Sequence, residues 1–249
     1  MFSLSGQAAF VTGAGRGLGE AIARGLAEAG ARVVLADIDG EAVQAVAGAM
    51  QAEGRECIAM RLDVRDEAAF GKCFDAAVHR FGAIDVMVNN AALTPSTSLW
   101  EISADEWDNV MAINLRGSFF GCRIAGRHML ERGSGRIINL SSMAGQQAST
   151  ATGAHYAASK AALLALTRSF AQELAPHGVT VNAIAPAAIR SPVLDTMDES
   201  RQSAVRATIP LGRFGEAREV AGAVVYLASE AGAFTTGATL DLNGGRFMR

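Results

Sequence analysis

Thr12-Gly-Ala-Gly-Arg-Gly-Leu-Gly19 is the stretch that decides the fold of this chain. It follows a short apolar run, Ala8–Val11, and leads into an Ala-rich amphipathic segment near residues 18–29, so it is a glycine-rich loop between a strand and a helix. Glycines at this place permit a tight turn and let backbone N–H groups approach a pyrophosphate at the helix N-terminus. The loop predicts a dinucleotide-binding unit, with a purely structural turn as the alternative.

The same strand–helix alternation continues along the whole chain, without a repeat or an interdomain linker. Because strands that alternate with helices form parallel sheets covered on both faces, we expect an α/β fold. It would be a Rossmann-like doubly wound sheet of about seven strands in a single domain, residues 1–249. Strands are expected at 8–11, 32–36, 57–62, 86–88, 136–140, 180–185 and 238–242, and helices near 18–29, 41–53, 67–81, 104–131, 156–176 and 217–229.

One segment, at about 189–215, breaks this alternation. It contains Pro192 and Pro210, several Ser and Asp residues, and a short helix-like piece around Ser200–Ala207. Insertions between a strand and a helix often form lids over a site, so a substrate loop or lid is predicted here. An ordinary surface loop is the alternative.

Composition excludes several classes of function. The 249 residues are 50% hydrophobic and 19% charged, and the net charge of −3 gives no field that would bind nucleic acid. Cys57, Cys73 and Cys122 lie far apart, and the four histidines lack ligand spacing, so neither a metal site nor a disulfide framework is expected. No signal peptide or membrane-spanning run is present, which indicates a cytoplasmic protein without a membrane partner.

The second expected strand ends in an acid, Asp37, which follows Gly19 by 18 residues. This is close to the spacing at which a carboxylate binds the adenosine ribose hydroxyls, and a carboxylate there repels a 2′-phosphate. NAD is therefore predicted as the cofactor. Arg16 offers a phosphate contact and keeps NADP as the alternative, and an N-cap role is the other interpretation of Asp37.

Tyr156 and Lys160 lie four residues apart in a helix-forming run. Side chains at i and i+4 share a helix face, and an ammonium beside a phenol lowers the pKa of the phenol from about 10. The pair predicts a general base for an alcohol, or a general acid for a carbonyl. A solvated helix face is the alternative.

Together these motifs resemble the short-chain dehydrogenase/reductase family in its single-domain form, from Thr12 to Gly245. The resemblance implies four catalytic residues: Asn114, Ser142, Tyr156 and Lys160. It also implies a cofactor site that includes Tyr156 and Lys160, with the adenine against Asp63 and Val64 and the nicotinamide carboxamide against the segment Pro186–Ser191. The other cofactor-binding residues are Gly13, Arg16, Gly17, Leu18, Gly19, Asp37, Asn90, Ala91, Pro186, Ile189 and Ser191.

The resemblance assigns a role to each catalytic residue. Tyr156 exchanges the proton, Ser142 hydrogen-bonds the substrate oxygen, and Lys160 lowers the pKa of Tyr156 and binds the nicotinamide ribose. Asn114 holds a water that links Lys160 to solvent. The alternatives are a buried helix amide for Asn114 and a satisfied strand-end hydroxyl for Ser142, with Ser141 as the other assignment.

The chain departs from the family pattern at several positions. Ala92 and Ala187 stand where the family usually has Gly, and Ser191 replaces a Thr. Each alanine adds a methyl near the cofactor and can restrict a backbone dihedral. The interval from Ser142 to Tyr156 is 14 residues, about one more than is typical, so the wall of the substrate pocket at 146–153 is expected to differ.

These features predict an oxidoreductase that transfers a hydride between NAD(H) and a small-molecule secondary alcohol or ketone. The alternative in the same class is a 3-oxoacyl-[acyl-carrier-protein] reductase using NADPH. Those enzymes dock the acidic carrier with surface arginines, at positions that carry Gly133 and His177 here, although Arg132 can substitute in part. A nucleotide-sensing Rossmann protein and a methyltransferase are less compatible with Tyr156 and Lys160. The apolar faces of the helix at 156–176 and the family resemblance predict a homotetramer.

Overall fold

The computed structural model of the chain describes residues 1–148, 151–190, 194 and 198–248. Seven parallel strands form one sheet in the order β3-β2-β1-β4-β5-β6-β7, which confirms the predicted doubly wound α/β fold. The strands are β1 (Ala8–Thr12), β2 (Arg32–Asp37), β3 (Cys57–Arg61), β4 (Val86–Asn89), β5 (Gly135–Leu140), β6 (Val179–Pro186) and β7 (Thr239–Leu242).

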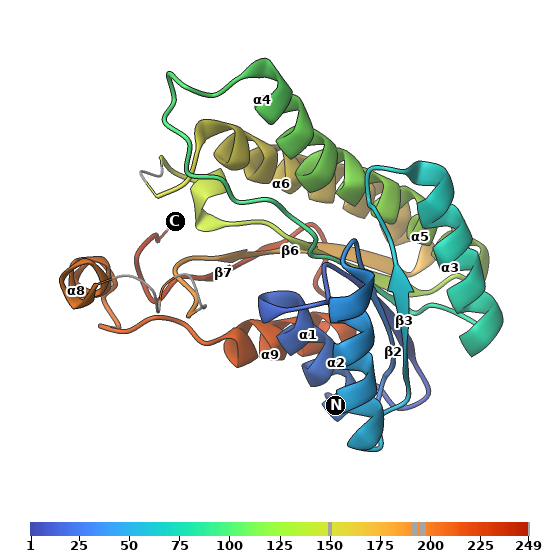
Figure 1. The fold of residues 1–249 in the computed structure, drawn as a ribbon. Coiled ribbons are helices and arrows are strands. Elements are labelled where there is room, and N and C mark those ends of the chain that lie inside the picture. The colour runs from blue at the N-terminus through green and yellow to red at the C-terminus, as the bar shows by residue number, and fades with distance from the viewer. Residues whose placement is uncertain (149–150, 191–193, 195–197, 249) are drawn as a thin grey trace.

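Helices cover both faces of this sheet (Figure 1). One layer consists of α1 (Gly17–Glu28), α2 (Gly40–Ala52) and α9 (Ala217–Ala228). The other consists of α3 (Glu67–Phe81), α4 (Ala104–Met111), α5 (Ser118–Arg132) and α6 (Ala154–Leu174). The short helix α8 (Glu199–Ala207) stands apart from both layers, at the side of the molecule where the chain also ends.

The alternation of side chains along β1 divides the core into two clusters. Ala9 and Val11 pack with the layer of α1, α2 and α9, whereas Phe10 packs with α3 and α5 on the other face. The Phe10 ring lies 5.9 Å from the rings of both Phe70 and Phe74. Burial of each such ring contributes about 1.5–3 kcal/mol, so the central strand is fixed on both sides.

The helix predicted at 104–131 is interrupted. Between α4 and α5 the chain forms a π-helical turn, Ala112–Gly117, which contains Asn114. The Asn114 carbonyl accepts a hydrogen bond from Ser118 Oγ (2.8 Å), and the Asn114 side chain bonds to groups outside the helix. Gly117 lies so close to Val64 that a Cβ there would be 2.8 Å from Val64 Cγ2. A wider turn that presents a polar side chain inward is typical of functional sites in helices.

The two ends of the insertion at 189–215 lie side by side. Ile189 pairs with Gly215, and Arg190 N donates to the Gly215 carbonyl (2.8 Å). Helix α8 occupies the helix-like stretch that the sequence indicated, and Asp198 caps it by accepting from Arg201 N. Residues 191–193 and 195–197 lie outside the described residues, so the predicted lid stays a prediction.

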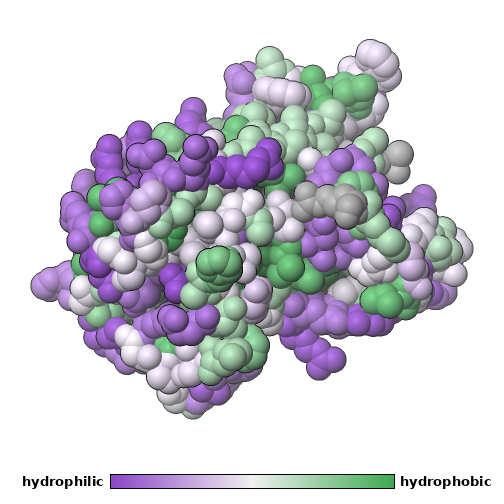
Figure 2. Space-filling view, turned by 180° about the vertical axis from the view of Figure 1, so that it is seen from behind, coloured by the Kyte–Doolittle hydropathy of each residue, from purple (hydrophilic) through white to green (hydrophobic). Residues whose placement is uncertain are grey.

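The surface is mixed in character. Figure 2 shows hydrophilic residues over much of one face, with hydrophobic ones at the top and in the middle. The loop before α4 carries the exposed side chains of Leu99 and Trp100. Among the described residues, no helix is long and apolar enough to cross a membrane. The same part of the chain holds no cluster of three or more metal-ligating side chains, and the three cysteines are free thiols.

Candidate active site

The glycine-rich loop has the backbone that its sequence predicts. Gly13 and Gly17 have φ of +65° and +60°, which favours glycine at both positions. A Cβ at Gly19 would overlap the Gly13 carbonyl oxygen and lie 2.6 Å from Asn90 Nδ2. That amide donates to the carbonyls of both Thr12 and Gly13 (3.0 Å each), so the end of β4 fixes the loop. The N-terminus of α1 is thereby left open toward a cleft.

Asp37 lies at the carboxyl end of β2 and faces this cleft. Its Oδ2 accepts from Gly15 N (2.9 Å) and its Oδ1 from Asp39 N (3.0 Å), so two backbone groups fix the carboxylate. The N-cap of α2 is Asp39, which accepts from Ala42 N (3.0 Å). The alternative N-cap interpretation of Asp37 is therefore wrong.

The cleft runs along the carboxyl ends of β1, β2, β4 and β5 and reaches α6. It brings together most of the predicted cofactor residues, namely Gly13, Arg16, Leu18, Gly19, Asp37, Asp63, Val64, Asn90, Ala91, Tyr156 and Lys160. It also contains residues that the sequence prediction missed: Ile38, Leu62, Leu93, Thr94, Ile113 and Leu140. Ile38 and Leu62 adjoin predicted acids in the sequence and were detectable, but nothing in the sequence distinguishes Thr94.

The predicted adenine end of the cleft is held by an ion pair. Arg65 Nη2 lies 2.7 Å from Asp63 Oδ2, and its hydrogen bonds lower the pKa of the Asp63 carboxyl. Arg65 Nη1 also donates to Asn109 of α4 (2.9 Å). The Asp63 carboxylate is therefore oriented by Arg65, which is itself held by α4, while Val64 packs against Gly117.

Tyr156 lies near the start of α6 and is 9% exposed. Burial raises the pKa of its hydroxyl above the usual 10.0, and hydrogen bonding from the side chains of Ser142 and Thr94 opposes part of that rise. Ser141 Oγ instead donates to the Lys160 carbonyl (2.8 Å), so it ties β5 to α6. Of the two adjacent serines, Ser141 lines the cleft, whereas Ser142 is the one whose hydroxyl acts on the pKa of Tyr156.

Lys160 is buried one turn along α6, where its Nζ donates to the Leu140 carbonyl (2.6 Å). Burial lowers the pKa of this ammonium to about 8. Nζ lies 5.7 Å from the centroid of the Tyr156 ring. We expected Lys160 to lower the pKa of Tyr156, but burial dominates and raises it above 10.0, opposed by the hydrogen bonds of Ser142 and Thr94.

Asn114 is fully buried and connects the cleft to α6. Its Oδ1 accepts from Leu93 N (2.8 Å), and its Nδ2 donates to the Leu93 carbonyl (2.9 Å) and to Ser159 Oγ (3.1 Å). Ser159 Oγ in turn donates to the Tyr156 carbonyl (2.7 Å). The contacts fix the loop after β4 against α6, and the water-holding role of Asn114 stays a prediction.

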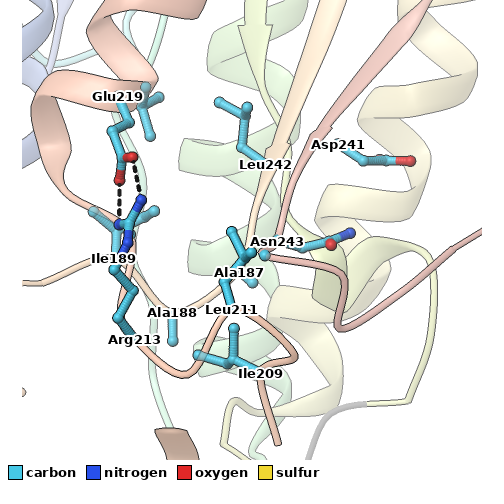
Figure 3. A pocket seen from close by; sticks show the side chains of 13 residues that line it. Ala187, Ala188, Ile189, Ile209, Leu211, Arg213, Glu219, Asp241, Leu242 and Asn243 are labelled. Carbon is cyan, nitrogen blue, oxygen red and sulfur yellow. Dashed lines mark hydrogen bonds and ion pairs between the residues drawn. The ribbon is translucent and has the colours of Figure 1, made fainter.

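The predicted nicotinamide segment adjoins a second cavity of about 180 Å³ (Figure 3). Pro186 ends β6 beside Leu242, and Ile189 lines the cavity. At its edge, Arg213 and Glu219 form a bidentate ion pair (2.7 and 2.9 Å), which lowers the pKa of Glu219 to about 2. Gly17 and Pro186 do not line the main cleft.

The departures from the family pattern fit without backbone strain. No described residue other than glycine has a positive φ, so Ala92 and Ala187 adopt ordinary conformations. Ala92 lines the cleft, and Ala187 N donates to the Leu242 carbonyl (3.0 Å). In the lengthened segment after Ser142, Gln146 Nε2 donates to Asp241 Oδ1 (2.7 Å). Ser191 lies outside the described residues, as do residues 149–150.

Comparison with known proteins agrees with this arrangement. The family model described as enoyl-(acyl carrier protein) reductase matches residues 13–246. The 3-oxoacyl-[acyl-carrier-protein] reductase of Vibrio cholerae is 38% identical over 246 residues, which cover 99% of each chain. The 2-dehydro-3-deoxy-L-rhamnonate dehydrogenase (NAD(+)) of a Sphingomonas strain is 39% identical over 243 residues, 97% of this chain and 96% of that one.

Solved structures show the same similarity. A putative short-chain alcohol dehydrogenase from Sinorhizobium meliloti superposes with a TM-score of 0.92 at 37% identity, covering 98% of both chains. A short-chain type dehydrogenase/reductase from Mycobacterium marinum gives a TM-score of 0.93 at 33% identity, covering 100% of this chain and 98% of that one. The chain belongs to the short-chain dehydrogenase/reductase family and is an oxidoreductase of that family.

Proposed function

We propose that this protein is an NAD-dependent dehydrogenase that interconverts a secondary alcohol and a ketone. The observation that carries the proposal is the buried Tyr156, hydrogen-bonded by Ser142, at one end of the cleft that has Asp37 at the other. The side chains of Ser142 and Thr94 favour the ionised form of this phenol, against the burial that raises its pKa.

The cleft fits a dinucleotide on several grounds. Gly13 and Gly19 lie so close to the residues that follow β4 that neither position has room for a side chain. A pyrophosphate would bind at this loop, at the N-terminus of α1. Asp37 would hold the adenosine ribose, Asp63 and Val64 the adenine, and Lys160 the nicotinamide ribose. When bound, the nicotinamide supplies the hydride acceptor or donor, because no side chain performs that chemistry.

The side chains would handle the proton. Tyr156 takes the hydroxyl proton of an alcohol as the carbon is oxidised, or returns it to the oxygen of a ketone as the carbon is reduced. Ser142 would hydrogen-bond the substrate oxygen and stabilise its developing charge. With a pKa of about 8, Lys160 is largely protonated at neutral pH, so it would place a positive charge beside the phenolate.

Asp37 supports NAD over NADP. Its carboxylate is fixed by two backbone N–H groups at the place where a 2′-phosphate would lie. Like charges at that separation repel, and both ribose hydroxyls can donate to the carboxylate. The name of the Sphingomonas relative specifies NAD(+), which adds support by analogy. Arg16 lines the same cleft and is the group that would favour NADP.

A 3-oxoacyl-[acyl-carrier-protein] reductase is the second candidate, favoured by the similarity to the Vibrio cholerae enzyme. The surface argues against it at one point. Arg132, the residue that would replace a carrier-docking arginine, pairs through Nη2 with Asp85 Oδ1 (2.8 Å) and donates through Nη1 to the Ile84 carbonyl (3.3 Å). Its neighbour Gly133 is the C-cap of α5 and carries no side chain. An acidic carrier would find little free charge at this spot.

We also propose a homotetramer. The outer side of α6 presents Ala165 and Leu166 to an open groove, which Leu115 and Phe119 complete. This is the second apolar face that the sequence of the helix predicted. We further propose a cytoplasmic location. The three cysteines are free thiols, and reducing compartments keep cysteines unpaired.

A turnover screen tests the function directly. The purified protein would be assayed with NAD and with NADP against polyols, simple secondary alcohols, hydroxysteroids and 3-hydroxyacyl thioesters. We expect turnover with NAD and a polyol or secondary alcohol. Preference for NADP with 3-hydroxyacyl thioesters would establish the second candidate instead, and no turnover with any pair would contradict both.

A further inference from the structure

At the start of α6, side chains from two other segments of the chain contact one carboxylate oxygen of α4. Thr97 Oγ1, from the loop between β4 and α4, donates to Glu106 Oε1 (2.6 Å). His155 Nε2, from the first turn of α6, lies 3.1 Å from the same oxygen. Glu106 belongs to α4 and is the only acid in the trio, and both contacts lower its pKa. We call Thr97, Glu106 and His155 the clamp.

The His155 ring is held in one orientation and one neutral tautomer within the clamp. Its side chain is 0% exposed, and its Nδ1 has no hydrogen-bond partner among the described residues. A proton on Nδ1 would be buried without an acceptor, so the neutral ring carries its proton on Nε2 and donates to Glu106. The Trp107 ring stacks on the imidazole, with centroids 6.5 Å apart and planes inclined by 18°.

Gly153 shows how closely these segments are packed. A Cβ at this position would lie 2.6 Å from His155 Nδ1 and 3.3 Å from the Thr97 carbonyl. Its φ is −64°, so space and not conformation requires glycine here. Gly153 N also donates to the Pro95 carbonyl (2.8 Å), which fixes the loop to the start of α6.

The loop after β4 is therefore held at three points in five residues. Leu93 bonds to Asn114 through both of its backbone groups, Pro95 bonds to Gly153, and Thr97 bonds to Glu106. Thr94 lies between the first two points and lines the same cleft as Tyr156, where its hydroxyl opposes the rise in the pKa of the phenol. Tyr156 in turn directly follows His155 in the sequence. The clamp thus connects the residue before the phenol to the loop that carries a partner of the phenol.

We propose that Thr97, Glu106 and His155 are positioning residues, which hold Thr94 in hydrogen-bond contact with the hydroxyl of Tyr156. The clamp touches neither substrate nor cofactor and acts through Thr94. Its importance for turnover rests on the proposed function of Tyr156, whereas the contact itself does not depend on that function. The relevant charged and polar neighbours of Tyr156 are Lys160 on its own helix, Ser142 after β5, and Thr94.

The expected consequence has a definite sign. A hydroxyl that donates to a phenolate favours the ionised form, so loss of Thr94 from its place raises the pKa of Tyr156. One hydrogen bond to a charged group corresponds to a shift of about one in pKa. Removing the clamp should therefore raise the pKa of Tyr156 in the same direction as removing the Thr94 hydroxyl, but by less, because Leu93 and Pro95 still hold the loop on either side of Thr94.

The chain offers a direct way to measure this shift. It contains two tyrosines, and the hydroxyl of the other, Tyr226, contacts Thr235 far from the site. In a Tyr226→Phe background, ultraviolet titration of the phenolate reports Tyr156 alone and needs no turnover. The variants in that background are Thr94→Val, Glu106→Ala, their combination, and Glu106→Gln. Asp105→Ala is the matched control, because Asp105 is an exposed acid in the same first turn of α4.

We expect Thr94→Val to raise the pKa of Tyr156 by about one and Glu106→Ala to raise it by a smaller amount. The combination should raise it no further than Thr94→Val alone, because both act through one hydrogen bond. Glu106→Gln should preserve the wild-type pKa, since an amide oxygen accepts from both Thr97 and His155. An unchanged pKa in Glu106→Ala or in Thr94→Val would overturn the proposal, as would additive shifts. A shift in the Asp105→Ala control would show a general charge effect and overturn it as well.

The proposed function fails by a different route. If Tyr156→Phe keeps full turnover, Tyr156 is not the proton-transfer group, yet the titration still decides whether the clamp holds Thr94. If the function holds, the kcat of Glu106→Ala should fall several-fold while the affinity for NAD stays that of the wild type. Restoration of kcat in Glu106→Gln distinguishes positioning from a general loss of stability.

Discussion

The proposed preference for NAD depends on one charge at the end of β2, and Asp37→Asn removes that charge with little change of shape. In the structure the carboxylate is held by Gly15 N and Asp39 N at 2.9 and 3.0 Å. A fixed charge cannot turn away when a phosphate approaches. Asparagine keeps one acceptor oxygen but presents an amino group to the other N–H, so the variant should lose about 1–2 kcal/mol of stability and remain folded.

The size of the effect follows from Coulomb's law. Two unit charges about 4 Å apart interact by about 1 kcal/mol in bulk water and by about 4 kcal/mol at an effective dielectric constant near 20. A 2′-phosphate carries nearly two negative charges. In bulk water the repulsion would therefore be about 2 kcal/mol, which corresponds to roughly 30-fold in relative kcat/KM. This is a lower limit, because the cleft is partly enclosed and its effective dielectric constant is below that of water.

The assay compares kcat/KM with NADP and with NAD for the wild type and for Asp37→Asn, using one alcohol substrate. We expect the ratio to rise by roughly 30-fold or more in the variant. Asp39→Asn is the control, because Asp39 caps α2 two residues away and asparagine is an equally good cap. An unchanged ratio in Asp37→Asn, or a wild type that prefers NADP, would refute the role given to Asp37.

Three further results are expected. Burial lowers the pKa of Lys160 from 10.5 to about 8, so between these values the folded protein binds fewer protons than the unfolded chain and its stability rises with pH. Urea unfolding should therefore show Lys160→Met to be more stable than the wild type by about 3 kcal/mol at pH 7, and this difference should largely disappear by pH 10. A difference that persists at pH 10 would contradict the lowered pKa of Lys160. Gly19→Ala should abolish NAD binding in calorimetry, whereas Gly48→Ala, on an open helix surface, should bind normally and gain about 0.5–1 kcal/mol; normal binding by Gly19→Ala would show that the loop tolerates a side chain. Sedimentation should show an oligomer that Leu166→Glu dissociates, and a clean 25.8 kDa monomer of the wild type would exclude the proposed assembly.

The strands and the glycine-rich loop were predictable because local sequence determines them. The buried strands are apolar runs bounded by turns, and the loop from Gly13 to Gly19 has positive φ at Gly13 and Gly17, where glycine is favoured. The interruption of the long helix at Asn114 was not predictable. It depends on side-chain bonds to Leu93 and Ser159, residues far away in the sequence. Helical periodicity carries no signal of such tertiary contacts.

The site was predictable to a similar degree. Spacing and resemblance predict catalytic roles for Tyr156, Lys160 and Ser142. The structure brings these three residues close together, and their roles stay predictions. The predicted downward shift of the Tyr156 pKa was wrong, because burial of the phenol outweighs the effect of a neighbouring charge. The spacing of two residues in the sequence does not reveal how deeply they are buried. Thr94 was missed for a related reason. It reaches Tyr156 through a loop path that only the folded chain defines.

The proton-transfer role of Tyr156 is the centre of this account, and Tyr156→Phe tests it most directly. The variant removes one oxygen atom from a buried ring and keeps the packing of α6, so NAD should still bind in a titration calorimeter. Under the same conditions kcat for alcohol oxidation should fall by about 10²–10⁴-fold, the range typical of a lost general acid or base. Wild-type turnover by Tyr156→Phe with NAD bound would contradict the account.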